Sequence, residues 1–350
     1  MPTGGGIDSA ASSRPASLAA DVAAALAANP VLLAPMAGIT EAPFRGICKR
    51  LGAGLTYTEM VSATGLHHHP DAPAAQRLLA LDPDEPTAAV QLFGASPSLM
   101  AEAVELVIGR LGERVALIDI NMGCPVNKVV AKGEGSGLMR TPELAADVVT
   151  AAVSAARGVP VSVKIRSGFE DGEVTAPKFA ARMEAAGASA VAIHPRTRSQ
   201  FYRGRSDWDV IAAVKQAVSV PVIGSGDVMS AADVVAMLER TGADAVMVAR
   251  GAQGNPWIFR EARALLAGEP LPEPPTPFDR IDMAREHMRL LIEFDGDHAF
   301  SRMRKHVAWY SAGMPGASHV RARVNSCASA AQIDTMLVEY GDWLRNTVGL

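Results

Sequence analysis

The chain contains very little cysteine. Only Cys48, Cys124 and Cys327 occur among the 350 residues, and no CxxC pair or zinc-type Cys/His spacing accompanies them. A disulfide framework is therefore not expected, and the pattern favours a cytoplasmic protein with reduced thiols. No apolar run is long enough to cross a membrane. The formal net charge of −4 excludes an overall basic field for nucleic acid, although local basic clusters remain possible.

The first segment, residues 1–29, is rich in Ala, Ser and Gly and lacks a block of Leu, Ile or Val. It does not resemble a secretory signal, so we expect a flexible leader with a single helix at 17–28. The run His67-His68-His69 looks like a cluster of metal ligands. Consecutive residues cannot all face one point, however, so a solvated loop is favoured and no metal is expected.

A regular alternation of short apolar runs and longer Ala-rich stretches organises the next 240 or so residues. Near-continuous apolar runs joined by long crossovers are typical of parallel strands buried on both faces. Eight such units predict a (β/α)8 TIM barrel, with a doubly wound open sheet as the alternative. The expected strands are 31–35, 55–59, 88–93, 116–121, 161–165, 190–194, 221–225 and 244–249, and the clearest helices are 97–111, 142–157, 177–187, 207–218 and 230–241.

The composition changes after residue 266, where GEPLPEPPTP forms a proline-rich stretch. We interpret 30–266 as the barrel and 267–278 as a linker. Residues 279–350 have helical patterns and predict a small all-α domain packed on the barrel, in a chain expected to be a monomer.

Polar residues stand where almost every predicted strand ends, and barrel enzymes build their sites at the carboxyl ends of the strands. The last two of these ends carry GSGD and ARGAQG, whose glycines allow backbone N–H groups to approach a phosphate. Lys164 and His194 also lie at strand ends. The alternative for Lys164 is a purely structural ion pair with Glu59, and for His194 it is a hydrogen-bonded core histidine.

Cys124 follows the strand at 116–121 in a Gly-Cys-Pro turn and is expected at the barrel mouth. Three roles are open: a buried structural thiol, a nucleophile, or a general acid. A thiol with an ordinary pKa near 8.5 is protonated at neutral pH and can donate a proton. No Ser/His/Asp order or Cys-His-Asn signature accompanies Cys124, so the acid is only slightly favoured over the nucleophile.

Seven motifs together resemble the tRNA-dihydrouridine synthase family, most closely its bacterial B-type branch. They are LAPMAGITEAPFR (33–45), DINMGCPVNKV (119–129), VKIRSGF (163–169), IHPRTRSQFYRG (193–204), PVIGSGDV (221–228), GADAVMVARGAQGNPWIF (242–259) and RKHVAWY (304–310). The resemblance runs from about Leu32 almost to the end of the chain. It departs at Ser225, where relatives commonly have Asn, and at Pro195, where a small residue is frequent.

The resemblance implies an FMN enzyme that reduces the 5,6 double bond of uridines in tRNA, with NADPH as electron donor. It implies that Cys124 donates the proton and that Asn121 and Arg196 orient the uracil. FMN would contact Pro35, Met36, Ala37, Gln91, Lys164 and His194, with its phosphate end at Ser225, Gly226, Asp227, Ala249 and Arg250. Two other functions are kept open: an FMN barrel oxidoreductase acting on a free pyrimidine, and a non-enzymatic RNA-binding protein.

Folded RNA is recognised largely by shape and backbone, so modest basic patches suffice to bind it. Lys128 and Lys132 lie on the loop that carries Cys124. Arg302, Arg304 and Lys305 cluster on one predicted helix. We expect these five residues to contact tRNA; for the helix, the alternative is an ordinary solvated face.

Overall fold

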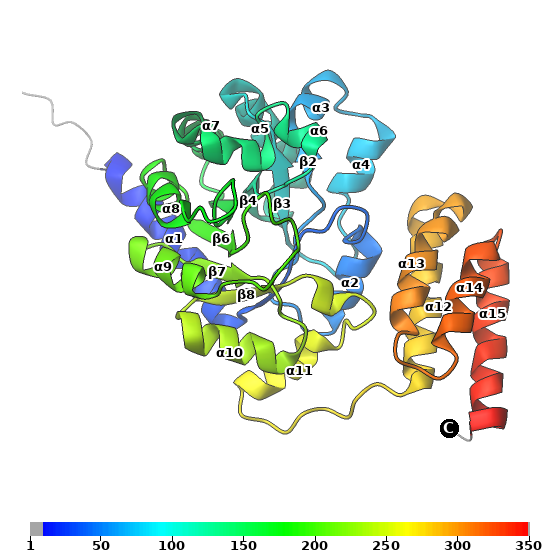
Figure 1. The fold of residues 1–350 in the computed structure, drawn as a ribbon. Helices are drawn as coiled ribbons and strands as arrows, with labels where there is room; N and C mark the ends of the chain where they lie inside the picture. Colours follow the sequence, from blue (N-terminus) through cyan, green and yellow to red (C-terminus); the bar gives the residue numbers. More distant parts are fainter. Residues whose placement is uncertain (1–9, 349–350) are drawn as a thin grey trace, which may run out of the picture.

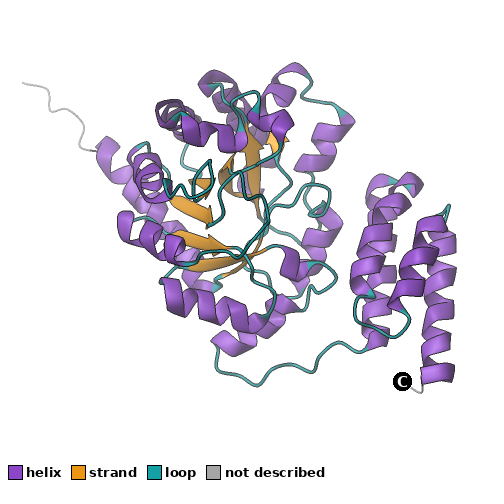
Figure 2. Cartoon of the chain, in the orientation of Figure 1, coloured by secondary structure: helices purple, strands orange, loops and turns teal. Residues whose placement is uncertain are grey.

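Eight parallel strands form the centre of the molecule (Figure 2). The structure is a computed structural model and describes residues 10–348. Neighbouring strands are paired in the order β1-β8-β7-β6-β5-β4-β3-β2, so from β2 to β8 each strand lies beside the next one in the sequence, and β8 pairs with β1. The strands are β1 Val31–Leu33, β2 Val61–Ser62, β3 Ala88–Phe93, β4 Val115–Met122, β5 Val161–Arg166, β6 Ala190–His194, β7 Val222–Ser225 and β8 Ala245–Val248.

The ring closes through residues 55–58, between β1 and β3. Leu33 N–H donates to the Leu55 carbonyl at 2.9 Å, and Ala89 N–H donates to the Thr56 carbonyl at 2.9 Å. The prediction of a regular strand at 55–59 is wrong in detail, because only single bridges form there. The Thr58 hydroxyl accepts the N–H of Gln91 at 3.0 Å, and this side-chain contact interrupts the backbone ladder. The predicted (β/α)8 barrel is confirmed.

The helices around the sheet follow from apolar spacing and from capping. In α5, Met100, Ala103, Val104 and Val107 recur at helical intervals and are all buried. Ser230 and Asp233 form a capping box at the start of α10, and Gly242 ends that helix with a left-handed φ of 67°. The barrel helices are α2 Ala42–Arg50, α3 Ala63–His68, α4 Pro73–Leu79, α5 Pro97–Leu111, α6 Asn127–Val130, α7 Pro142–Ala155, α8 Ala176–Ala185, α9 Asp209–Ala217, α10 Ala231–Thr241 and α11 Ile258–Leu266.

An N-terminal helix, α1 (Ala10–Ala28), packs against the barrel. Val22 and Leu26 are buried with Leu32, Tyr57 and other side chains that fill the barrel interior. The helix expected at 17–28 therefore lies within α1, and its apolar face covers core residues. Residues 1–9 of the expected leader lie outside the described residues.

A helical bundle follows an extended connection after Leu266 (Figure 1). It has its own apolar core, which includes Leu291, Met303 and Ile333. The predicted all-α part is confirmed, and α14 is an additional helix within it. The elements are α12 Pro277–Asp295, α13 Phe300–Tyr310, α14 Ala317–Ser326 and α15 Ala330–Trp343, with a final π-helical turn at Leu344–Val348. Within residues 10–348, no helix has both the length and the apolar character needed to span a bilayer.

One fully buried ion pair ties α2 to the segment before β3. The Arg45 guanidinium is 1% exposed and binds both oxygens of Glu85, whose side chain is completely buried. Arg45 also donates to the carbonyls of Thr40 at 2.8 Å and Ala80 at 2.6 Å. The Thr56 hydroxyl donates to the same carboxylate. This pair therefore links the loop after β1, α2 and the closing segment of the barrel.

We predict that Glu85→Ala lowers the free energy of unfolding by about 3 kcal/mol or more, because removal of one partner leaves a buried charge unpaired. Urea unfolding monitored by circular dichroism measures the change. The matched control is Asp84→Ala, which removes an exposed partner of Arg50 and should cost under about 1 kcal/mol. Equal losses for the two variants would contradict the assignment of Glu85 as a stabilising link.

Candidate active site

A cavity of about 460 Å³ opens at the carboxyl ends of the strands. Every residue that the sequence resemblance assigned to the cofactor lines its wall, together with Asn121 and Cys124. These residues come from β1, β3, β4, β5, β6, β7 and β8 and from the loops that follow them. Strand pairing in register explains the convergence, since adjacent parallel strands end at the same edge of the sheet.

A chain of buried side-chain hydrogen bonds lies along the wall formed by β3, β4 and β5. The Asp119 carboxylate accepts from Gln91 Nε2 at 2.6 Å and from Ser162 Oγ at 2.5 Å. Because the Gln91 amide directs its NH2 group to Asp119, its Oε1 atom accepts from Asn121 Nδ2 at 2.9 Å. The chain of bonds fixes the orientation of both amides.

The same network holds the loop of Cys124. Asn121 Oδ1 accepts the backbone N–H of Cys124 at 2.9 Å, and the Ser136 hydroxyl donates to the Cys124 carbonyl at 2.8 Å. Gly135 has a φ of 57°, and a Cβ placed there would lie 3.0 Å from the Cys124 Cβ. Glycine is therefore required for the loop to return this close to the cysteine.

Burial raises the pKa of the Cys124 thiol, and a hydrogen bond from the backbone of Val126 and the charge of Arg166 offset only part of this effect. Arg166 Nε donates to the Gly123 carbonyl at 2.6 Å, and so it supports the turn beside the cysteine. The thiol is therefore protonated at neutral pH, which fits a proton donor better than a nucleophile.

Lys164 is a cavity residue whose ammonium group is partly desolvated. Burial lowers the pKa of Lys164 to about 8, although the nearby charge of Asp119 opposes the shift. The alternative ion pair with Glu59 is not formed: Glu59 instead accepts the backbone N–H of Gly38. Lys164 is thus able to donate to a ligand in the cavity.

His194 lies among positively charged groups. Burial, followed by the charges of Lys164, Arg166, Arg196 and Arg250, lowers the pKa of His194 well below its ordinary value, so its ring is neutral. Arg196 Nη1 lies 3.3 Å from His194 Nε2. Because a guanidinium only donates, Nε2 is the acceptor and the ring proton lies on Nδ1.

The ends of β7 and β8 form a compact arginine–aspartate cluster. The Asp227 carboxylate accepts from Arg196 at 2.7 Å, from Arg250 at 2.9 Å and from the Ser206 backbone at 2.8 Å. Burial acts to raise the pKa of Asp227, but these hydrogen bonds and charges lower it overall. Gly226 has a φ of 119°, and a Cβ there would meet Ser206 Oγ at 2.4 Å. A side chain at Gly226 is thus excluded.

Arg196 does not lie on the cavity wall, contrary to its expected role in orienting uracil. Its side chain is 2% exposed, and its guanidinium donates to the carbonyls of Arg203 and Gly204 as well as to Asp227. These contacts use the guanidinium to hold the loop after β6.

The three basic residues predicted to cluster on one helix, now α13, all form hydrogen bonds with other parts of the protein. Arg302 pairs with Asp295, and Arg304 donates to the Cys327 carbonyl at 2.8 Å. Lys305 donates to the carbonyl of Gly38, in the loop after β1 that lines the cavity. The ammonium group of Lys305 thus joins the helical bundle to the barrel. Lys128 and Lys132 are exposed, as expected.

Three further residues of the site were missing from the predicted set. Asp119 and Arg166 orient the residues around Cys124, and Tyr202 forms an exposed part of the cavity rim. An acidic residue inside the apolar run VALIDI was a usable signal for Asp119. Tyr202 lies in a loop without periodicity, so its position depends on the tertiary fold. The rim also contains the exposed apolar side chains of Val126, Phe201 and Met229.

Comparison with known proteins yields one family. The family model described as Dihydrouridine synthase (Dus) matches residues 32–342. The chain is 42% identical over 313 residues to tRNA-dihydrouridine synthase B of Pseudomonas aeruginosa, covering 87% of this chain and 92% of that protein. It is 41% identical over 295 residues to the probable tRNA-dihydrouridine synthase 1 of Synechocystis sp., covering 84% and 81%, respectively.

Among solved structures, histamine dehydrogenase from a Rhizobium species has a similar fold. The TM-score is 0.51 at 16% sequence identity, and the match covers 75% of this chain and 49% of that one. At this identity the likeness concerns the fold alone.

We predict that the rate of alkylation of Cys124 by iodoacetamide reaches half of its maximum at a pH above about 8.5, the ordinary pKa of a free thiol. Burial disfavours the reactive thiolate, so the rate at neutral pH should be low and should rise as the pH increases. Mass spectrometry of the labelled peptide measures the profile, and Cys124→Ser identifies the site. Half-maximal labelling below about pH 8 would contradict a protonated resting thiol.

Proposed function

Because the chain belongs to the dihydrouridine synthase family, we propose that it reduces the C5–C6 double bond of particular uridines in tRNA, with FMN as cofactor and NADPH as electron donor. The observation that carries the proposal is a protonated Cys124 thiol on the wall of the same cavity as Gln91, Lys164 and His194. A tRNA substrate implies a cytoplasmic protein.

The cavity fits FMN in size and in chemistry. Its volume lies in the range of cofactor sites, about 300–1,000 Å³. At the phosphate end, Gly226 lines the cavity without a side chain and Arg250 supplies a half-exposed guanidinium. On the same cavity wall, Lys164 and the Nδ1 proton of His194 are donors suited to the polar edge of a flavin. We assign the remaining contacts to Pro35, Met36, Ala37, Gln91, Ser225, Asp227 and Ala249.

When bound and reduced, FMN would supply the hydride that C6 of uracil receives. Cys124 then gives its proton to C5, and the thiolate is reprotonated from solvent. Asn121 accepts a hydrogen bond from the backbone N–H of Cys124. Because it lies beside the cysteine, Asn121 is also the candidate for positioning the uracil. The raised pKa suits this step, because a thiolate could not donate.

The cavity rim favours an unstacked nucleotide over a duplex. The target uridine must leave its stack to reach Cys124. Tyr202 is 57% exposed at the rim, and its ring lies over the guanidinium groups of Arg166 and Arg250, at 5.8 and 5.5 Å. These cations hold an aromatic surface on which a base can stack. Lys128 and Lys132 follow Cys124 in the sequence, are exposed, and are suited to contacts with phosphate groups.

We predict that Cys124→Ala lowers the rate of dihydrouridine formation about 10²- to 10⁴-fold, the usual contribution of a positioned general acid. Mass spectrometry of tRNA from a bacterial strain lacking its own dihydrouridine synthases, supplied with each variant, measures the product. Cys327→Ala is the matched control, because Cys327 lies in the helical bundle. Unchanged dihydrouridine with Cys124→Ala would refute the proposal, as would efficient turnover of free uridine by the native protein.

We predict that Tyr202→Ala raises KM for tRNA about tenfold, since loss of base–aromatic stacking costs about 1–3 kcal/mol. Steady-state kinetics on unmodified tRNA transcripts, at saturating NADPH, measures the effect. Val174→Ala is the control, because Val174 is equally exposed but does not line the cavity. An unchanged KM for Tyr202→Ala would exclude stacking at this residue.

A further inference from the structure

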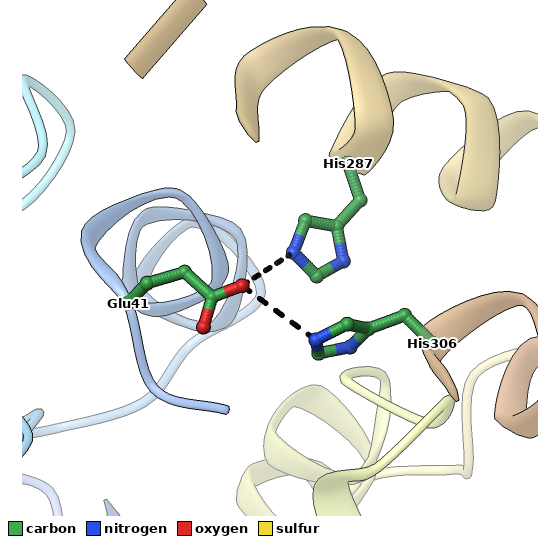
Figure 3. A group of neighbouring side chains, drawn as sticks. All are labelled: Glu41, His287 and His306. Carbon is green, nitrogen blue, oxygen red and sulfur yellow. Dashed lines mark ion pairs between the residues drawn. The ribbon is translucent and has the colours of Figure 1, made fainter. Parts of the chain in front are cut away.

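A buried cluster of three side chains lies between the barrel and the helical bundle (Figure 3). Glu41 immediately precedes α2, whereas His287 belongs to α12 and His306 to α13. Glu41 is 3% exposed and both histidines are completely buried. Figure 3 shows the Glu41 carboxylate directed toward both imidazole rings. These residues are far apart in sequence, which explains why no zinc-type spacing is visible in the chain.

The distances within this cluster are too long for hydrogen bonds. Glu41 Oε1 lies 3.9 Å from His287 Nε2 and 3.6 Å from His306 Nε2, whereas N–H···O bonds are normally about 2.7–3.2 Å long. Two ligands of a tetrahedral zinc ion, each bound at about 2.0–2.1 Å, are about 3.3 Å apart. To reach this spacing, Glu41 Oε1 would have to approach His306 Nε2 by about 0.3 Å and His287 Nε2 by about 0.6 Å. Potential ligand atoms of the three residues all lie within 4.8 Å of one another.

The polar atoms of the cluster have no hydrogen-bond partner among residues 10–348. They are both carboxylate oxygens of Glu41, Nε2 of His287, and both ring nitrogens of His306. A buried polar atom without a partner costs about 1–3 kcal/mol. A single cation could bind both oxygens and the two Nε2 atoms together. It would remove this energetic cost and connect the barrel to the helical bundle.

The surroundings orient the rings for such a role. The Tyr310 hydroxyl lies 3.3 Å from His287 Nδ1, which leaves Nε2 directed to Glu41. Phe44 stacks on His287, with ring centroids 5.4 Å apart. Trp309 meets His306 edge-on, with centroids 5.1 Å apart. Ligand histidines typically have their second nitrogen bonded, as His287 has; the ring of His306 is positioned by packing alone.

The charges around the cluster are compatible with a single dication. Of the two nearby cations, Arg302 is paired with Asp295 and Lys305 is bound to the Gly38 carbonyl. Two imidazoles and one carboxylate are typical ligands of zinc, and both Glu41 oxygens are available to complete four donors.

We propose that Glu41, His287 and His306 form a structural site for one divalent transition-metal ion of the zinc class. The ion joins the loop after β1 to α12 and α13. That loop also lines the cavity through Pro35, Met36 and Ala37. The site thereby fixes the helical bundle relative to the cavity, and its existence does not depend on the proposed reaction.

The test measures metal directly. Untagged, FMN-loaded protein is dialysed against a chelator, exposed to Zn²⁺, freed of excess ion and analysed by mass spectrometry for zinc. We expect about one zinc per chain in the native protein and a loss of at least tenfold in Glu41→Gln and in His306→Gln. The control, with His67→Ala and His68→Ala combined, removes exposed histidines and should retain the ion. Flavin absorbance and circular dichroism report whether each variant is folded.

A second measurement uses the native chain alone, so that it does not depend on variants that fail to fold. Co²⁺ added to the chelator-treated protein should give the visible absorption of a four-coordinate site, and Zn²⁺ should abolish it and raise Tm. Failure of the native protein to bind either ion would overturn the proposal. Zinc that stays in both triad variants but is lost with His67 and His68 would also overturn it.

Discussion

The geometry of the cavity depends on one buried carboxyl group, Asp119, which accepts hydrogen bonds from Gln91 and Ser162. Asp119 lies inside the barrel with no exposed surface. Burial raises the pKa of Asp119, while hydrogen bonds from Gln91 and Ser162 and the charge of Lys164 act in the opposite direction. Its acceptor role sets the amide of Gln91, and Gln91 in turn sets Asn121. The position of Cys124 thus depends on Asp119 through a chain of three hydrogen bonds that passes through Gln91 and Asn121.

A second constraint is the excess of positive charge around His194. Lys164, Arg166, Arg196 and Arg250 surround His194, and among them only Arg196 and Arg250 have a carboxylate partner, Asp227. Such an arrangement favours an anionic ligand, whose charge would offset the mutual repulsion of these groups. It also keeps His194 neutral, so the ring can donate from one nitrogen only. The fold therefore sets both the charge of the ligand and the hydrogen bonds offered to it.

The sequence predicted the barrel well because its signals are local. Apolar runs such as VSVKI and AVAIH have the length and composition of buried parallel strands, and the structure has them as β5 and β6. Residues at the ends of these strands follow directly from the fold, so Lys164 and His194 could be placed in the cavity in advance. The irregular closing segment at 55–58 could not be foreseen, since it depends on the Thr58 hydroxyl reaching Gln91 on a neighbouring strand.

Two predicted RNA-contact residues, Arg196 and Lys305, have partners within the protein that are distant in sequence. Arg196 and Lys305 are basic residues in polar motifs, and local sequence gives each the character of an RNA contact. In the fold, Arg196 meets Asp227 from the next strand, and Lys305 meets Gly38 across the boundary between barrel and bundle. The Gly38 peptide is held on both sides, because its N–H donates to Glu59 while its carbonyl accepts from Lys305. The loop that lines the cavity is therefore shaped jointly by the barrel and by the helical bundle, and a change in the position of the bundle would be transmitted to the cavity wall.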